Sequence, residues 1–313
     1  MKTAPARFLR KWRQRATRNS RPRRALYYSG LAEVRLPFAA VPLPAGSRIA
    51  CRVEYDGSRY NGWQAQPHPA QKTVQTTLET ALSTVAAAPV RVNCAGRTDS
   101  GVHGHGQIIH FDAPTQRSAK AWVLGTNSYL PPDVRVHWAV AVPGDFHARF
   151  SALARRYRYV IADTPVRPAL LGGQVSWQRT ALDHRVMHEA AQALLGERDF
   201  SAFRAATCQS TGPMRNVHLL DVSRRGDLVI IDIKANAFLH HMVRNIAGSL
   251  LAVGRGHRSP EWIGQLLAGR DRSVAADTAP AAGLYLVEVD YPSRYDLPPT
   301  PYGPLLLGPP LSD

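Results

Sequence analysis

A glycine-rich stretch at residues 95–106, AGRTDSGVHGHG, carries the side chains best suited to chemistry. It places Asp99 close to Arg97, with His103 and His105 further along. Glycine lets backbone approach a bound molecule closely, and an arginine two residues away can keep a carboxylate ionised or contact a phosphate. Two interpretations are open on these residues alone. The stretch is either a frame for a catalytic carboxylate or a polar turn, because Asp and Gly favour turns for local reasons.

Neither a dinucleotide site nor a metal site is favoured by the pattern. The glycines follow the order G-x-x-G-x-G rather than GxGxxG, and a strand rather than a helix is expected after them. His110 and the pair His240 and His241 add potential ligands, but no HExxH or comparable spacing is present. We therefore expect no metal and no cofactor.

The charge balance points to a polyanionic partner. The 313 residues include 39 Lys and Arg against 23 Asp and Glu, which gives a formal net charge of +16. Ten of the basic residues fall within residues 1–24, and the first acidic residue is Glu33. An excess of this kind favours nucleic acid or an acidic membrane surface as a partner.

The basic segment at 1–47 is expected to be a disordered N-terminal arm. Three roles are open for it: a nonspecific nucleic-acid tail, an organelle transit peptide, or an upstream mis-called start with no selected function. It lacks the apolar core of a secretory signal.

The apolar pattern and the cysteines indicate a cytoplasmic protein without a membrane partner. No apolar run approaches the roughly 18–20 residues that a membrane span needs. The odd set of three cysteines, Cys51, Cys94 and Cys208, contains no CxxC pair. Such a set fits a reducing compartment and excludes zinc-finger and redox motifs.

The first half of the chain, residues 48–143, predicts the order β-α-β-β-α-β. Apolar residues alternate over 48–55, as in a half-buried strand. Thr73 can cap a helix whose apolar residues share one face. Further strands are expected at 90–95, 107–112 and 133–142, with a helix near 118–127.

The second half, residues 150–291, repeats this order without repeating the sequence. Strands are expected at 155–161, 216–223, 228–235 and 284–291, and helices at 183–195, at about 238–253 and after a Ser259 cap. We therefore predict an α+β protein of two ferredoxin-like, RRM-like βαββαβ modules, with mainly antiparallel sheets that meet at a central basic cleft. The tail at 292–313 contains seven prolines and is expected to lie extended on the surface.

Several separated segments resemble one known family. GRTDSGVH resembles the signature of the TruA-type tRNA pseudouridine synthases. Four further segments are similar to that family in the same order: EYDGSRYNGWQ (54–64), DFHARFSALARRYRY (145–159), LLGERDFSAFR (194–204) and KANAFLHHMVRNIAGSLLAVG (234–254). The resemblance covers about 48–308 and leaves out the arm. Two small departures are Ser100, where the family most often has Ala, and Gly104.

The resemblance implies an isomerase that converts uridine to pseudouridine at positions 38, 39 and 40 of the tRNA anticodon stem-loop. It implies a homodimer with one tRNA bridging both subunits, and it implies no cofactor. Asp99 would be the single essential carboxylate, Tyr157 the active-site tyrosine and Arg244 the arginine that pairs with Asp99. The residues implied to contact tRNA are Arg97, Arg117, Tyr157, Phe146, His147, Ala148, Arg149, Phe150, Thr207, Cys208, Gln209, Ser210 and Thr211.

Two other function classes compete with this interpretation. A non-catalytic RNA-binding or chaperone protein of two RRM-like modules explains the fold and the charge, but it gives no use to the Asp99 loop. A basic protein of membrane surfaces, driven by the arm, is the third hypothesis.

Overall fold

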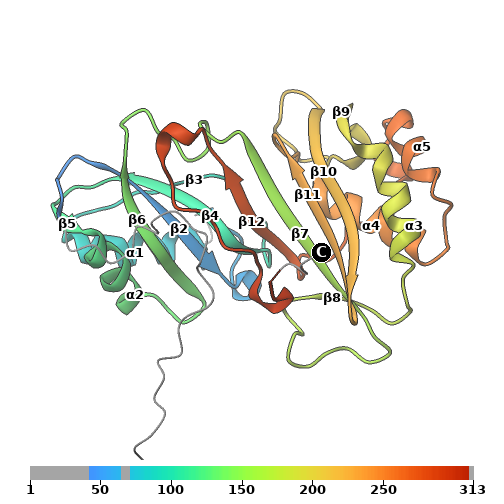
Figure 1. Cartoon of the computed structure of the whole chain (residues 1–313), viewed down its shortest axis with the longest axis horizontal. Coiled ribbons are helices and arrows are strands. Elements are labelled where there is room, and N and C mark those ends of the chain that lie inside the picture. The colour runs from blue at the N-terminus through green and yellow to red at the C-terminus, as the bar shows by residue number, and fades with distance from the viewer. Residues whose placement is uncertain (1–41, 65–70, 310–313) are drawn as a thin grey trace, which may run out of the picture. The chain divides into compact units, whose positions relative to one another are not determined.

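The structure, a computed structural model, describes residues 42–64 and 71–309. In these residues, helices pack against one continuous sheet of ten strands, most of whose pairings are antiparallel (Figure 1). The predicted α+β class is confirmed. None of the helices in the described part of the chain combines the length and the apolar character that a bilayer span requires.

The N-terminal half follows the predicted order of elements. Its elements are β2 (Arg48–Tyr55), α1 (Val74–Ala86), β3 (Asn93–Cys94), β4 (His103–Asp112), a π-helical turn (Ala121–Gly125), α2 (Thr126–Tyr129) and β6 (Val134–Val142). The strands lie in the order β6-β2-β4-β3, which is that of a ferredoxin-like module. Helix α1 begins at a capping box in which the side chains of Thr73 and Thr76 each bond the other residue's backbone N–H.

The C-terminal half has the same arrangement with two added strands. Its elements are β7 (Ala154–Asp163), β8 (Ser176–Gln178), α3 (His184–Ala191), β9 (Gly196–Asp199), β10 (Met214–Arg225), β11 (Leu228–Ala235), α4 (Met242–Gly254), α5 (Trp262–Gly269) and β12 (Leu284–Asp290). The strand order β12-β7-β11-β10 is again ferredoxin-like, and β9 extends it at the edge.

A short parallel pairing joins the two halves into one sheet. β12 pairs with β4 through Tyr285 opposite His103 and Leu286 opposite Gly104. The rings of His103 and Tyr285 stack across this seam with centroids 4.6 Å apart. The close approach requires glycine at 106, because a Cβ there would lie 2.1 Å from the carbonyl oxygen of Val287.

Two apolar cores lie under the helices. Leu78 and Leu82 of α1 belong to the same buried cluster as Ile49 of β2. In the other half, Ile246 of α4 packs in one cluster with Tyr159 of β7. Side chains alternate along a strand. The residues next to Tyr159 on β7 therefore face the opposite side of the sheet.

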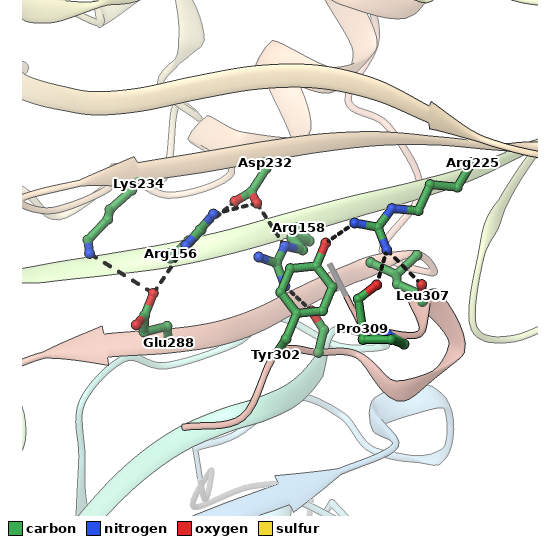
Figure 2. Close-up of polar contacts among 10 residues, drawn as sticks. Arg156, Arg158, Arg225, Asp232, Lys234, Glu288, Tyr302, Leu307 and Pro309 are labelled. Atoms are coloured by element: carbon green, nitrogen blue, oxygen red, sulfur yellow. Dashed lines mark hydrogen bonds and ion pairs between the residues drawn. The ribbon is translucent and has the colours of Figure 1, made fainter. Parts of the chain in front are cut away.

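The C-terminal tail covers that opposite side. Two 3₁₀ turns, Ser293–Tyr295 and Leu305–Leu307, interrupt it, and Leu307 is buried against Val160 and Val287. Figure 2 shows Tyr302 beside Arg158 and Arg225. The two guanidinium carbons lie 3.8 Å and 5.2 Å from its ring centroid. The predicted extended tail is thus a packed segment.

Other expectations need correction at their boundaries. The strand predicted at 107–112 begins four residues earlier, at His103, and α4 begins at Met242 rather than near 238. Helix α5 follows Glu261, which makes no side-chain cap, so the Ser259 cap was wrong.

Residues 1–41 of the expected arm lie outside the described residues, but β1 (Pro42–Leu43) pairs with β5 (Arg117–Ser118), so the last part of the arm is ordered. The domain boundaries stay a prediction.

Candidate active site

The loop between β3 and β4 carries Asp99 and is held from both sides. The Ala95 N–H donates to the Ile108 carbonyl at 2.8 Å, and the Trp63 N–H donates to the Thr98 carbonyl at 3.0 Å. The hydroxyls of Tyr55 and Thr98 bond each other at 2.9 Å. A strand and a neighbouring segment therefore fix the backbone next to Asp99.

Three cationic or donor groups surround the Asp99 carboxylate. Arg244 Nη1 lies 3.2 Å and His241 Nε2 3.3 Å from Oδ2, whereas His240 Nε2 lies 3.5 Å from Oδ1. The side chain of Asp99 is 28% exposed and that of Arg244 is 16% exposed. The carboxylate is thus paired, yet solvent still reaches it.

Helix α4 places Arg244 opposite this loop. Its Nε donates to the Ala279 carbonyl at 2.8 Å, and the Ala279 N–H donates to the Arg244 carbonyl at 3.1 Å. Glycine is needed one turn later, because a Cβ on Gly248 would lie 2.0 Å from the Asp277 carbonyl oxygen. The segment around Ala279 can therefore lie tight against α4 and orient the guanidinium.

Tyr157 projects from β7 toward the same space. Its ring meets that of Phe238 edge-on at 5.0 Å, and its hydroxyl would lie 3.5 Å from a Cβ built on Gly96. Burial raises the pKa of the phenol well above its usual value; Arg155 opposes this rise and Asp99 adds to it. The hydroxyl therefore stays protonated at neutral pH.

A cavity of about 960 Å³ opens above these residues. Asp99, Tyr157 and Arg244 all line it, and Asp99 is the one acidic side chain among its described lining residues. Four further arginines line it: Arg97, Arg149, Arg155 and Arg215. The cavity is therefore strongly basic around a single carboxylate, an arrangement suited to a polyanionic substrate that reacts at one carbon.

Comparison with known proteins decides the family. A family model described as tRNA pseudouridine synthase matches residues 51–151 and 190–292. The chain is 59% identical over 260 residues to tRNA pseudouridine synthase A of Actinobacillus pleuropneumoniae, an alignment that covers 83% of this chain and 98% of that protein. This protein belongs to the tRNA pseudouridine synthase family. The protein of the same name from Vibrio parahaemolyticus is 58% identical over the same shares.

In this family member, many of the predicted tRNA-contacting residues lie at the cavity. The cavity is lined by Arg97, His147, Arg149, Phe150, Cys208, Gln209 and Ser210 as well as by the three predicted catalytic residues. Phe150 is 75% exposed, so its ring is open to a ligand. Proximity alone does not test these roles, which stay predictions.

Other predicted contacts lie elsewhere in the synthase. Phe146 and Ala148 have no exposed surface, so their side chains are packing groups rather than tRNA contacts. Arg117 lies on β5 outside the cavity and donates to the Val85 carbonyl at 3.0 Å. Thr207 and Thr211 are not among the lining residues, although the Thr207 hydroxyl lies 3.1 Å from Nδ1 of His240.

Sequence reasoning gave no role at this site to Arg155 or to the histidine pair. Arg155 precedes Tyr157 by two residues on a strand, so period-2 alternation already predicts a shared face. His241 lies three residues before Arg244, but it precedes α4 in a left-handed conformation that helical spacing does not predict. Only the signal for Arg155 was present in the sequence.

The histidine pair also bears on the expectation that no metal is bound. One group of potential metal ligands in the described residues is Asp99, His240 and His241, whose ligand atoms lie within 4.8 Å of one another. Arg244 contacts the same carboxylate oxygen as His241. Its positive charge would repel a metal cation at that position. The donor set fits an ion pair better than a metal centre.

Proposed function

We propose that this protein converts uridine to pseudouridine at positions 38, 39 and 40 of the tRNA anticodon stem-loop, with Asp99 acting at C1′ of an everted nucleotide. The observation that carries the proposal is one carboxylate, paired with Arg244, in a cavity otherwise lined by basic side chains. The family assignment supports the reaction type. The three positions in the stem-loop are the part of the proposal that goes beyond the family assignment.

The reaction breaks the N1–C1′ bond and forms a C5–C1′ bond, so it is an isomerisation without any net redox change. Breaking the glycosidic bond develops positive charge at C1′, which a carboxylate stabilises. Asp99 then either adds to C1′ or removes the 2′ proton to give a glycal. In both routes the uracil rotates and C5 bonds to C1′. In the first route the bond between Asp99 and C1′ breaks as this bond forms, and in the second the proton on Asp99 returns to C2′. The C5 proton is then lost and N1 gains a proton.

We propose that Tyr157 binds the detached uracil and takes part in its proton transfer. Its ring offers a face on which the detached base stacks, and its hydroxyl is the candidate for taking the C5 proton. Phe238 packs edge-on against that ring and holds its orientation. Water has to be excluded during the rotation, because hydrolysis at C1′ would make the cleavage irreversible.

The basic lining explains how RNA is held. Arg149, Arg155 and Arg215 line the same cavity as Arg97, which is proposed to help evert the nucleotide. Eversion costs a few kcal/mol of lost stacking, and contacts to phosphate and filling of the vacated space offset that cost. Because phosphate contacts position rather than specify, shape selects the stem-loop.

Two further features belong to this proposal. The family resemblance implies a homodimer in which one tRNA contacts both subunits. A substrate of this kind also implies action in the cytoplasm, where mature tRNA is available.

Replacing Asp99 tests the proposal. Purified wild-type and Asp99→Asn proteins are incubated with tRNA, pseudouridine is mapped by position, and tRNA affinity is measured by filter binding. We expect modification at 38–40 with the wild type, background modification with Asp99→Asn, and affinities within about threefold of each other, since the substitution changes few phosphate contacts.

Asp227→Asn, in the exposed turn between β10 and β11, is the matched control and should modify tRNA normally. Unchanged modification by Asp99→Asn would remove Asp99 from the mechanism. Tight tRNA binding without modification by the wild type would favour the competing function, a non-catalytic RNA-binding protein.

A further inference from the structure

The two oxygens of the Asp99 carboxylate have different surroundings. Oδ2 has two nitrogen neighbours: Arg244 Nη1, which donates a hydrogen bond at 3.2 Å, and His241 Nε2, which lies 3.3 Å away. Oδ1 faces His240 Nε2 at 3.5 Å, the limit of a hydrogen bond. One oxygen is therefore held from two sides, while the other has a single and longer contact.

His241 reaches Oδ2 only because its backbone is in an unusual conformation. It precedes α4 with φ +60° and ψ +5°, in the left-handed region, where a residue with a Cβ pays about 1–2 kcal/mol. Glycine or asparagine adopts this conformation at lower cost. A histidine kept here, three residues before Arg244, puts both side chains on one side of the helix start. Strained backbone conformations of this kind cluster at functional sites. The conformation of His241 therefore suggests that its side chain has a function.

The electrostatic setting of His241 suits a neutral imidazole. Burial lowers the pKa of its imidazole; Asp99 opposes this, whereas His240, Arg244 and Arg272 add to it. A neutral imidazole whose Nε2 lies 3.3 Å from Oδ2 occupies the space beside that oxygen without bringing a second full charge to the carboxylate. Arg244 then supplies the positive charge next to the carboxylate, and His241 restricts the orientation of the carboxylate.

His240 is the more exposed histidine of the pair. Its side chain is 39% exposed against 28% for His241, and the two rings lie tilted with centroids 4.0 Å apart. Its Nδ1 lies 3.1 Å from the Thr207 hydroxyl, on the loop that supplies other cavity residues. Oδ1 therefore lies beside the more exposed histidine, whereas Oδ2 lies beside Arg244 and the less exposed one.

We propose that His241 is a positioning residue that shares Oδ2 of Asp99 with Arg244, so that Oδ1 is the atom that acts at C1′. The inference rests on the proposed function and adds an assignment of the reacting oxygen. Whichever route the reaction takes, addition or proton removal, the lone pair used is that of Oδ1. Free rotation of the carboxylate would lower the fraction of time that a lone pair points at the sugar.

The test uses His241→Gly in the full chain, because glycine keeps the backbone conformation and removes only the imidazole. Single-turnover rates on tRNA are measured with and without added imidazole, together with tRNA affinity. We expect the rate to fall roughly 10- to 100-fold, because a small misplacement of a catalytic group lowers a rate by up to about 100-fold. Affinity should stay within about twofold, and imidazole should restore part of the rate because the vacated site is open to solvent.

Two variants keep the result decisive. His241→Asn tolerates the same backbone conformation and offers an amide donor, so its rate should lie between those of the wild type and His241→Gly. Ala87→Gly replaces another residue with positive φ, at the end of α1, and should leave the rate unchanged.

The inference would be overturned if the His241→Gly rate were within twofold of the wild-type rate. It would also be overturned if added imidazole did not restore any of the lost rate. Either result would leave the activity of the wild type, and so the proposed function, unaffected. Failure of the proposed function itself would show as a wild type without activity.

Discussion

The Tyr157 hydroxyl is protonated at neutral pH, and this limits what it can do. An ordinary phenol is already protonated there, and burial raises the pKa of this one further. In the proposed mechanism, it can therefore take the C5 proton only while it passes its own proton on. At the scale of single residues, the proposal makes the hydroxyl a relay and the ring a surface for stacking.

Replacing Tyr157 with Phe separates these two roles. The ring stays, so tRNA affinity should be unchanged, whereas the loss of a positioned acid–base group should slow pseudouridine formation by about 100-fold or more. The measurement is the single-turnover rate with ordinary and C5-deuterated uridine in the tRNA. The isotope effect should grow in Tyr157→Phe, because removal of the C5 proton becomes the slow step.

Tyr159→Phe is the control for this prediction. Tyr159 lies two residues further along β7 and donates to the Pro280 carbonyl at 2.9 Å, with no surface exposed. Its substitution should cost stability without changing the isotope effect. An equal isotope effect in wild type and Tyr157→Phe would contradict the relay role.

Residue types and spacing singled out the Asp99 loop, whereas the roles predicted for Tyr157 and Arg244 were implied by the family resemblance. Asp99, Tyr157 and Arg244 are far apart in sequence, and only the family resemblance linked them. The left-handed backbone of His241 was not predicted, because a positive φ is uncommon at any single position that is not glycine. Phe146 and Ala148 were assigned to tRNA contact because family segments were transferred whole, whereas alternate residues of that segment point into the core.

Among the elements, α4 depends on contact with the 277–279 segment. A methyl group at Gly248 would meet the Asp277 carbonyl oxygen at 2.0 Å, so Gly248→Ala must push this segment away. Ala279 bonds both the backbone and the side chain of Arg244, and the guanidinium should therefore move with it. We expect a loss of about 1–3 kcal/mol in the free energy of unfolding, measured by urea denaturation, and a lower kcat.

Gly264→Ala provides the matched substitution in α5. The nearest atom to its new methyl group would be Cβ of Ala193 at 3.8 Å, an ordinary contact. Because alanine favours helix over glycine, stability should rise by up to about 1 kcal/mol and kcat should not change. A Gly248→Ala protein as stable and active as Gly264→Ala would refute the role of this contact.

Element types were easier to predict than element ends. The alternation over 48–55 predicted β2 within its observed bounds, although both faces of that strand are buried and the predicted half-buried strand was wrong on this point. β4 was predicted four residues too short because Gly104 and Gly106 locally favour a loop. Gly106 is required for the close approach of β12, a contact between residues about 180 apart that no local pattern records, whereas Gly104 leaves room for the ring of Tyr55 on β2.

For the molecule as a whole, the tail bridges the two halves behind the cavity. The Pro301 carbonyl lies 3.2 Å from Nε2 of His105 on β4, and Arg158 of β7 donates to the Gly303 carbonyl. Arg225 donates to the Tyr302 hydroxyl at 2.9 Å and to the Leu307 carbonyl at 2.8 Å (Figure 2). The tail therefore supports a seam that has only two residue pairs in register.

Tyr302→Ala should weaken this support. Loss of the ring between two guanidinium groups, together with its packing, should lower the free energy of unfolding by roughly 1–3 kcal/mol. The readout is urea denaturation. Leu305→Ala is the control, because that side chain is 75% exposed in the same tail and should change stability by less than about 0.5 kcal/mol. Equal stability of the two variants would rule out the tail as a brace.

The seam could not be predicted from the sequence. Each half completes its own strand order, so nothing in the periodicity indicated that β12 would pair with β4 as well. The prolines of the tail correctly excluded regular helix and strand, but they did not reveal that Tyr302 and Leu307 would be anchored on the sheet.

The order of the strands has a consequence for biosynthesis. The N-terminal half leaves the ribosome first and can fold early, with Gly104 of β4 already paired with Tyr55 of β2, but the other edge of β4 at the seam stays unpaired until Tyr285 and Leu286 have been made. Through that interval the nascent chain carries an unpaired strand edge close in sequence to Asp99. Asp99, Tyr157 and Arg244 are all synthesised before β12, so the ribosome completes the proposed catalytic residues while this edge is still uncovered.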